Sequence, residues 1–512
     1  MTLGKVILVG AGPGAPDLIT VRGADALRAA DVVVYDALAP SALLDLAPPQ
    51  AVRIDVGKRG HESPTLPQEE TTALLLRLAS EGKCVVRLKG GDPYVFGRGG
   101  EEASACAEAG IPFEVVPGVS SIFGALAYAG IPITDRRYGA SFAVVTGHKD
   151  PTPVTAETRW DQLAHAADTL IVLMGMRNLE DIVGKILAAG RAASTPAAAV
   201  MNGTLPTQRV VEAPLGSLVE RVTEAGLGAP TVIAIGDVVR LRTALNWYES
   251  RPLFGRRVLV TRSSEQAGEM VAALREAGAD PVVMPMIRLV PPTETAQVDA
   301  ALARLADYDV LLFTSANAVR FTVERARERG VSLARLPGEV VCVGPKTAEA
   351  ALAAGLPVHR VPQQRFDAEG VLEDVLQSLA PRGKRFLLPR SEIGRDVLPE
   401  GLRRAGAEVD AVAVYRNVPA ETDGARLRKA LGDGELDALT FTSPSTVRHF
   451  AALLDAAARK SAARCVVAAI GPLTAAALRE IGLAPHVTPE RATACELVAQ
   501  LAAHMAEPRD SR

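Results

Sequence analysis

The sequence has few cysteines, and their placement excludes a stapled or zinc-bound fold. The 512 residues include Cys84, Cys106, Cys342, Cys465 and Cys495, which are odd in number, far apart and never in a Cys-x-x-Cys pair. This pattern indicates neither a disulfide framework nor a metal site. We therefore expect the five side chains to act as small buried apolar residues and expect no bound metal.

The chain also lacks an excess of one charge and lacks long apolar runs. Its 56 Lys and Arg residues against 59 Asp and Glu give a net charge of −3, which argues against a nucleic-acid or anionic-membrane binder. Hydrophobic residues make up 48%, yet no uncharged apolar stretch approaches the roughly 20 residues that span a bilayer. Residues 1–5 lead into a strand-like run without a signal-peptide pattern. The sequence predicts a soluble, cytoplasmic protein.

What the sequence does contain is an alternation of strand-like and helical segments. Strand-like runs at 5–9, 32–35, 85–88, 142–146 and 170–174 alternate with segments rich in Ala, Leu and Arg. This alternation predicts an α/β fold with parallel layers, and the length predicts three or four domains. The pattern breaks around 245–257, where Trp247, Pro252 and Gly255 precede a new strand. We expect the main domain boundary there.

The second half contains a long internal repeat. RVLVTRSS at residue 257 matches RFLLPRSE at 385, and FTSANAVRF at 313 matches FTSPSTVRHF at 441. VGPKTAEAA at 343 matches IGPLTAAAL at 470. A period of about 128 residues is too long for a solenoid and indicates two homologous α/β lobes. Small-molecule sites commonly lie in the cleft between such lobes.

The chain opens on a glycine-rich turn, VGAGPGAPDL at 9–18, directly after a strand. A dinucleotide-binding turn is one interpretation, but Pro13 and Pro16 interrupt the position of the expected helix and remove two backbone N–H donors. A glycine loop that lets another ligand approach the backbone fits the residues better.

Several further motifs carry a family resemblance. They are KGGDPYVFGRGGEE (89–102), VPGVSS (116–121), AGIPIT (129–134), GAGPG (10–14), VGKR (56–59) and NGT (202–204). Together they resemble the uroporphyrinogen-III C-methyltransferase family, part of the tetrapyrrole methylases, over residues 3–245. The resemblance implies two α/β lobes with S-adenosylmethionine bound in the cleft between them, and a homodimer formed through this half.

The resemblance also implies site residues. It assigns Asp36 as a proton acceptor and Lys58 as a proton donor, and both follow strand-like runs. It places in the S-adenosylmethionine site Pro13, Gly90, Gly91, Asp92, Val95, Ser120, Ser121, Met174 and Gly203. Plainer interpretations stay open: a simple turn at Gly90 and Gly91, a strand core at Met174 and a helix cap at Asp36. Asp135 stands where relatives often carry histidine, which leaves the substrate contacts there open.

The repeat blocks, with AEGVL at 368–372 and LLPRS at 387–391, resemble uroporphyrinogen-III synthase over residues 254–505. That family implies two α/β lobes that exchange segments through extended connectors, here 287–292 and 415–419, and implies no cofactor. Tyr415 matches a tyrosine that assists loss of the substrate hydroxyl. Candidate substrate-binding residues are Arg262, Thr314, Ser315, Lys346, Arg390, Ser391, Thr442 and Ser443. Ser315 and Ser443 also suit helix N-caps, and the free N–H groups of a helix start can bind carboxylates as well.

The two resemblances predict a bifunctional enzyme whose substrates are tetrapyrroles. The C-terminal half would cyclise hydroxymethylbilane to uroporphyrinogen III with inversion of the last ring, and the N-terminal half would methylate the product at C2 and C7 to precorrin-2. The alternative is a methylase of a later precorrin with a non-catalytic tetrapyrrole-binding module. The expected domains are a methyltransferase at 1–245, a linker at 246–255, a synthase at 256–505 and a tail at 506–512. Within the synthase, lobe one would comprise 256–286 with 420–505, and lobe two 293–414.

Overall fold

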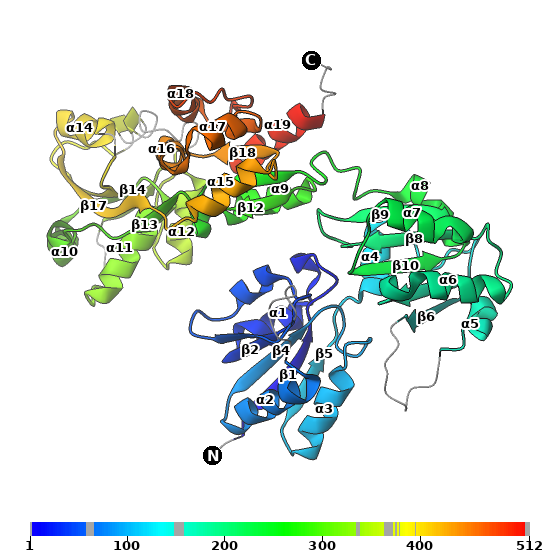
Figure 1. Cartoon of the computed structure of the whole chain (residues 1–512). Coiled ribbons are helices and arrows are strands. Elements are labelled where there is room, and N and C mark those ends of the chain that lie inside the picture. The colour runs from blue at the N-terminus through cyan, green and yellow to red at the C-terminus, as the bar shows by residue number, and fades with distance from the viewer. Residues whose placement is uncertain are drawn as a thin grey trace. The chain divides into compact units, whose positions relative to one another are not determined.

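The computed structural model describes residues 3–57, 66–147, 158–333, 338–362, 372–373, 376–377, 379–394 and 396–506. The chain forms two compact units (Figure 1). The first comprises Met1–Arg257, Leu274–Asp280 and Ala502–Arg512, and the second comprises Val258–Ala273 and Pro281–Leu501. Across the described ranges, every helix is too short or too polar to cross a bilayer.

The first sheet of the N-terminal unit is entirely parallel. Its strand order is β3-β2-β4-β1-β5. The strands are β1 (Lys5–Gly10), β2 (Val32–Tyr35), β3 (Val52–Asp55), β4 (Cys84–Lys89) and β5 (Phe113–Val116). The crossover helices α1 (Val21–Arg28), α2 (Gln68–Ser80) and α3 (Gly99–Glu108) contribute to apolar cores on both faces. Because all strands run the same way, their carboxyl ends meet at one edge.

The second sheet of this unit is mixed. Its order is β6-β7-β10-β8-β9, and only β6 and β7 are parallel. The strands are β6 (Phe142–Thr146), β7 (Thr169–Leu173), β8 (Pro196–Met201), β9 (Arg209–Pro214) and β10 (Thr231–Ile235). The expectation of parallel layers is wrong for β8 to β10, because a short loop rather than a crossover helix joins β8 to β9. Helix α4 (Ser121–Tyr128) covers one face and shares its core. The other face is covered by α5 (Trp160–Ala166), α6 (Leu179–Ala188) and α7 (Leu218–Glu224).

The segment expected to be a linker, 246–255, packs on the N-terminal unit. Trp247 Nε1 donates a hydrogen bond to the Ala127 carbonyl at 3.1 Å, and the buried Tyr248 hydroxyl donates to the Thr204 carbonyl at 3.1 Å. The rings of Tyr128 and Tyr248 meet edge to face with centroids 4.7 Å apart. Aromatic packing and two hydrogen bonds therefore fix the exit of the chain from this unit.

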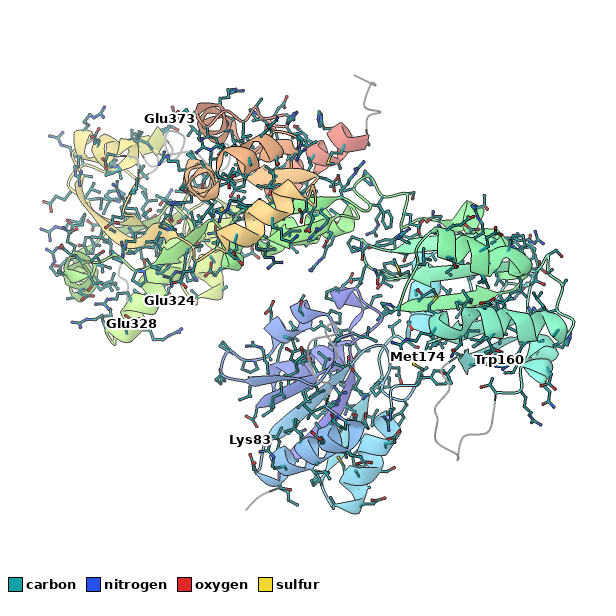
Figure 2. The ribbon with its side chains drawn as sticks, viewed as in Figure 1. Lys83, Trp160, Met174, Glu324, Glu328 and Glu373 are labelled. Carbon is teal, nitrogen blue, oxygen red and sulfur yellow. The ribbon has the colours of Figure 1, made fainter. Side chains whose placement is uncertain are left out.

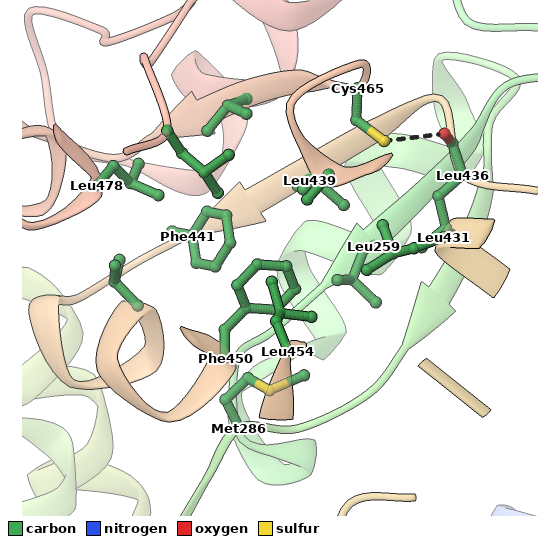
Figure 3. Packing of buried hydrophobic residues seen from close by; sticks show 14 of the residues in the cluster. Leu259, Met286, Leu431, Leu436, Leu439, Phe441, Phe450, Leu454, Cys465 and Leu478 are labelled. Carbon is green, nitrogen blue, oxygen red and sulfur yellow. Dashed lines mark hydrogen bonds between the residues drawn. The ribbon is translucent and has the colours of Figure 1, made fainter. Parts of the chain in front are cut away.

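The C-terminal half contains a parallel sheet made from distant segments. Its order is β12-β11-β18-β19, with β11 (Arg257–Val260), β12 (Asp280–Val283), β18 (Ala438–Phe441) and β19 (Val466–Ala469). Leu259 pairs with Leu439, and Thr440 Oγ1 donates to the Leu259 carbonyl at 2.7 Å. Phe441 and Phe450 form the centre of its core, edge to face at 5.0 Å (Figure 3). The α/β fold class with segment-exchanged lobes is confirmed.

The helices around this sheet come mostly from the C-terminal end of the chain. They are α9 (Gly268–Glu276), α15 (Gly424–Gly432), α16 (Pro444–Leu453), α17 (Ala456–Ala462), α18 (Pro472–Glu480) and α19 (Ala494–Ala506).

The other sheet of the second unit has the order β13-β17-β16-β14-β15. The strands are β13 (Ile287–Val290), β14 (Val310–Phe313), β15 (Glu339–Cys342), β16 (Arg385–Ser391) and β17 (Glu408–Pro419). The two connectors pair with each other as antiparallel strands, with Ile287 opposite Pro419 and Val290 opposite Arg416. Helices α10 (Ala296–Ala303), α11 (Ala316–Glu328), α12 (Pro345–Ala353) and α14 (Val397–Arg404) pack around it.

Candidate active sites

Three loops meet in backbone contact at the carboxyl edge of the first sheet. Gly12 and Gly91 exchange two backbone hydrogen bonds of 3.2 and 2.7 Å. A Cβ atom added to Gly10 would lie 2.5 Å from the Gly118 Cα atom, and one added to Gly118 would lie 2.3 Å from the Gly91 carbonyl oxygen. Such approaches are possible only for glycine, so the loops after β1, β4 and β5 depend on the glycines in their motifs.

Asp92 ties two of these loops together. Its Oδ2 atom accepts a hydrogen bond from the Gly118 amide at 3.0 Å, and its Oδ1 atom accepts one from the Tyr94 amide at 2.8 Å. The half-buried Val95 lies in the same turn, and its amide donates to the Asp92 carbonyl at 3.3 Å. The carboxylate therefore shapes the loop whatever ligand it also contacts.

A second wall of this edge comes from α4 and from the loop after β8. The N-cap of α4 is the buried Ser120, and a Cβ atom at Gly91 would lie 3.8 Å from the Ser120 Cα atom and 3.9 Å from the Ser121 amide. A Cβ atom at Gly203 would lie 2.3 Å from the Ala125 side chain on α4. Contacts with α4 therefore bring together four of the predicted cofactor-binding residues, namely Gly91, Ser120, Ser121 and Gly203.

Pro13 belongs to the same cluster. A Cβ atom at Gly124 of α4 would lie 2.5 Å from Pro13 Cγ, and the nearby Ala15 amide donates a hydrogen bond to Thr204 Oγ1 at 2.9 Å. Met174 lies apart in the chain, directly after β7, in a left-handed conformation with φ +54° (Figure 2). Its side chain is 49% exposed, so the interpretation as a strand core residue is wrong.

Asp36 lies at the end of β2, at the same edge as the glycine loops. Its Oδ1 atom accepts a hydrogen bond from the Gly90 amide at 3.4 Å, and its Oδ2 atom lies 3.7 Å from Arg87 Nη2. The side chain remains 28% exposed. A Cβ atom at Gly90 would lie 2.7 Å from Leu38 Cβ, so that position also requires glycine. Lys58 lies outside the described residues.

Three buried charged residues next to Asp36, namely Arg87, Lys89 and Glu102, are not among the predicted site residues. Glu102 Oε1 lies 3.2 Å from Arg87 Nε and 3.0 Å from Lys89 Nζ. Burial, and next the neighbouring Arg87, lowers the pKa of Lys89, which Glu102 partly offsets. The sequence does hold a signal for this group, namely two cations within the buried strand VVRLK followed by the paired glutamates of GRGGEE.

Asp135 lies in the connection between α4 and β6. Its carboxylate binds the Arg137 guanidinium at 2.9 Å, and this hydrogen bond lowers the pKa of Asp135. Asp135 is thus a carboxylate already engaged by a neighbouring cation.

In the second unit, the buried Tyr415 lies on β17 with its hydroxyl 3.4 Å from Ser315 Oγ. Ser315 is the N-cap of α11 and accepts a hydrogen bond from the Ala318 amide at 3.1 Å. The Tyr415 ring stacks on Phe321 of the same helix at 5.5 Å, with 17° between the planes. The sequence-predicted cap and the sequence-predicted tyrosine therefore meet.

The remaining candidates of this unit fall into two groups. Arg262 Nε donates to Gln266 Oε1 at 3.1 Å, Gln266 donates to Asn317 on α11 at 2.7 Å, and burial lowers the pKa of Arg262. Lys346 on α12 pairs with Glu269 on α9 and thereby lowers the pKa of that carboxyl. These contacts join elements of the two lobes.

The second group lies at the ends of β14, β16 and β18. Arg390 binds Asp396 at 2.7 Å, and Ser391 ends β16. Thr314 and Thr442 directly precede the two serine caps, and Ser443 accepts a hydrogen bond from the Thr446 amide at 3.3 Å. Arg262 and Arg390 hold the same position in the repeat but have different partners, one a neutral amide and the other a carboxylate.

A cavity of about 340 Å³ opens beside the paired connectors. Its lining includes Pro285, Arg288, Glu421, Thr422 and Arg426. The sequence-predicted substrate-binding residues do not line it. This cavity is therefore separate from the Tyr415 cluster.

Comparisons with known proteins match two stretches of the chain to two different families. Residues 5–219 match the family model for Tetrapyrrole (Corrin/Porphyrin) Methylases, and residues 268–499 match the model for Uroporphyrinogen-III synthase HemD. Porphyrin biosynthesis protein HemD of Ruminiclostridium josui is 37% identical over 506 residues, which cover 98% of each chain. The chain thus belongs to the family in which a tetrapyrrole methylase is fused to a uroporphyrinogen-III synthase.

Other relatives match only part of the chain. The siroheme synthase of Azotobacter vinelandii is 50% identical over 250 residues, which cover 49% of this chain and 53% of that protein. The present chain thus spans about half the length of that relative. A crystal structure of uroporphyrin-III C-methyl transferase from Thermus thermophilus, complexed with S-adenyl homocysteine, is 39% identical. The match covers 46% of this chain and 100% of that one, with a TM-score of 0.40.

Proposed function

We propose that this bifunctional methylase and synthase makes uroporphyrinogen III and then methylates it. In this proposal, the C-terminal half closes hydroxymethylbilane to uroporphyrinogen III with inversion of the last ring. The N-terminal half methylates the product at C2 and C7 to give precorrin-2. The observation that carries the proposal is the glycine-lined edge beside Asp36, within a chain matched along its length by a porphyrin biosynthesis protein.

At the carboxyl edge of the first sheet, Gly10, Gly12, Gly91 and Gly118 meet, and we call this region the glycine edge. Its residues suit S-adenosylmethionine. Gly91 has φ +67°, and a Cβ atom there would already contact the Ser120 Cα atom at 3.8 Å, so glycine leaves room for a ligand to approach the backbone. The N-terminus of α4 presents amides beside it, which can bind a carboxylate. When bound, S-adenosylmethionine supplies an electrophilic methyl group. Pro13, Gly203 and Ser120 would enclose the ligand from the side of α4.

Asp36 is the proposed proton acceptor of the methylase half. Alkylation of a pyrrole carbon requires loss of a proton from the macrocycle, which a positioned carboxylate can accept. The Gly90 amide and Arg87 hold the two oxygens of Asp36 from one side, while the partly exposed side chain stays accessible to substrate. Lys58 as a proton donor remains part of the proposal on the resemblance alone.

In the synthase half, Tyr415 is the proposed proton donor to the departing hydroxide. Stacking on Phe321 fixes the ring, and Ser315 fixes the direction of the hydroxyl. Arg262 and Lys346 are proposed to bind substrate carboxylates, which would compete with the Glu269 carboxylate that already interacts with both cations. No cofactor is proposed here, because the leaving group departs readily and the main task is to fold the bilane.

The proposal is tested on the full-length protein with hydroxymethylbilane as the only tetrapyrrole. Without S-adenosylmethionine we expect uroporphyrinogen III to accumulate, and with it we expect precorrin-2. Asp36→Asn should abolish the second product and leave the first unchanged, because ring closure depends on the other unit. Loss of both products from a folded variant would contradict the division of labour, and full methylation would remove Asp36 from its role.

A further inference from the structure

We infer that Arg87 and Glu102 are positioning residues for Asp36, with the buried Glu102 carboxylate holding the Arg87 guanidinium against the Asp36 side chain. This inference rests on the proposed function, in which Asp36 accepts a proton. It adds Arg87 and Glu102, which would not touch the substrate and would act on methylation only through Asp36.

Arg87 is fixed on every side. Its Nε atom binds Glu102 at 3.2 Å, and its Nη1 atom donates to the Val34 and Leu88 carbonyls at 3.4 and 3.3 Å. Its Nη2 atom is left to face Asp36 at 3.7 Å. The side chain is 5% exposed, so it cannot turn away into water. The guanidinium therefore presents a fixed charge to one oxygen of Asp36.

The charge balance of the buried group requires Asp36. Arg87 and Lys89 contribute two positive charges, whereas the fully buried Glu102 contributes one negative charge. Gln68 Nε2, Arg87 and Lys89 all bind the same Glu102 oxygen, Oε1. Oε2 has no hydrogen-bond partner among the described residues. Unbalanced buried charge is costly, and Asp36 is the second carboxylate that lies within ion-pair distance of Arg87.

Other charged groups adjoin Asp36 from the neighbouring elements. Asp55 ends β3 and is paired in register with Tyr35, the residue before Asp36, while Asp92 lies in the loop after β4. Lys58 lies outside the described residues. Among the described residues, Arg87 is the cation that reaches Asp36, at 3.7 Å. Glu102 holds its guanidinium in place at 3.2 Å.

Two substitutions should therefore lower kcat for methylation without weakening S-adenosylmethionine binding. Arg87→Gln removes the cation that faces Asp36, so we expect kcat to fall about tenfold. Glu102→Gln keeps the cation but replaces the carboxylate that holds it, so we expect a smaller fall in kcat. KM for S-adenosylmethionine should stay within about twofold in both, because Asp36 and not the cofactor site is affected.

A matched control pair lies on α2 of the same unit. Arg77 and Glu81 are also 3.2 Å apart but are largely exposed, and Arg77→Gln and Glu81→Gln should leave kcat unchanged. Arg87→Lys retains a cation but lacks the planar guanidinium, so it should keep only part of the wild-type kcat, and it serves if Arg87→Gln fails to fold.

The outcomes distinguish a failure of this inference from a failure of the proposed role of Asp36 as proton acceptor. Full activity of Asp36→Asn would overturn the proposed role of Asp36. An inactive Asp36→Asn together with wild-type kcat in the folded Arg87 and Glu102 variants would overturn only the inference. A rise in KM for S-adenosylmethionine as large as the fall in kcat would also overturn it, because general damage to the fold would affect the cofactor site as well.

Discussion

Replacement of Tyr415 by Phe should change the product of the synthase half more than its stability. The substitution keeps the stacked ring at 5.5 Å from Phe321 and removes one hydroxyl. Because Tyr415 is the proposed proton donor, its replacement should slow loss of the substrate hydroxyl. Spontaneous closure to the symmetrical, uninverted isomer should then compete, so the fraction of type III product should fall.

The magnitudes follow from the contacts of the hydroxyl. Its hydrogen bond to Ser315 is long, at 3.4 Å, so the loss of folding free energy should be about 0.5 kcal/mol and at most about 1 kcal/mol. A general acid contributes about 10²- to 10⁴-fold to a rate. We expect the lower end, because the hydroxyl departs readily and the folded bilane geometry supplies much of the rate.

The assay measures the ratio of the symmetrical, uninverted isomer (type I) to uroporphyrinogen III (type III) after a single addition of hydroxymethylbilane. Thermal unfolding of the variant is measured alongside. Tyr308→Phe is the matched control, because that buried tyrosine donates to the carboxylate of Asp410 in the same lobe. Removing a hydrogen bond to a charged group costs about 1.5 to 3 kcal/mol, so Tyr308→Phe should lose more stability and keep pure type III product. Wild-type rates and pure type III product from Tyr415→Phe would return Tyr415 to a packing role.

Two further predictions concern the glycine edge and an ion pair of the second unit. Gly118→Ala places a Cβ atom 2.3 Å from a carbonyl oxygen, so calorimetry should show weakened S-adenosylhomocysteine binding and a lower melting temperature. Gly100→Ala, with nothing within 4 Å, should show neither effect, and equal behaviour of the two would refute the close approach. The Arg325 guanidinium holds the pKa of Asp299 below its ordinary value, so the stability that this pair adds is present above the unfolded-state pKa and is lost as pH falls through the folded-state pKa. Arg325→Ala should therefore lower the free energy of unfolding at pH 7 more than at pH 3, and an equal loss at both values in urea titrations would contradict that sign.

The methylase edge could be predicted only through the family resemblance, because glycines directly after a strand are equally compatible with a plain turn. The structure brings Gly91, Asp92 and Gly118 together at one edge. The buried charges could not be paired in advance, because Arg87 and Glu102 come from different elements and meet only when α3 packs on β4.

The same reason explains the missed contacts of the synthase half. Lys346 and Glu269 are 77 residues apart and lie on helices of different lobes, and no local pattern relates them. The antiparallel strands β8 to β10 were missed because a short apolar strand carries no mark of its direction. The exchange of segments between lobes was anticipated only through resemblance, since the repeat by itself is equally compatible with two separate lobes.

The exchanged strands also set the order in which a growing chain can fold. β11 ends at Val260, and its neighbour β18 begins at Ala438, so an interval of roughly ten to forty seconds separates the two at ordinary translation speeds. During that interval, the edge of β11 that β18 will occupy has unpaired N–H and C=O groups. The sheet of β13 to β17 is complete once Pro419 has emerged, before β18 exists. We therefore expect this sheet to form first on the ribosome, and nascent chains arrested before residue 438 to need chaperone protection at β11.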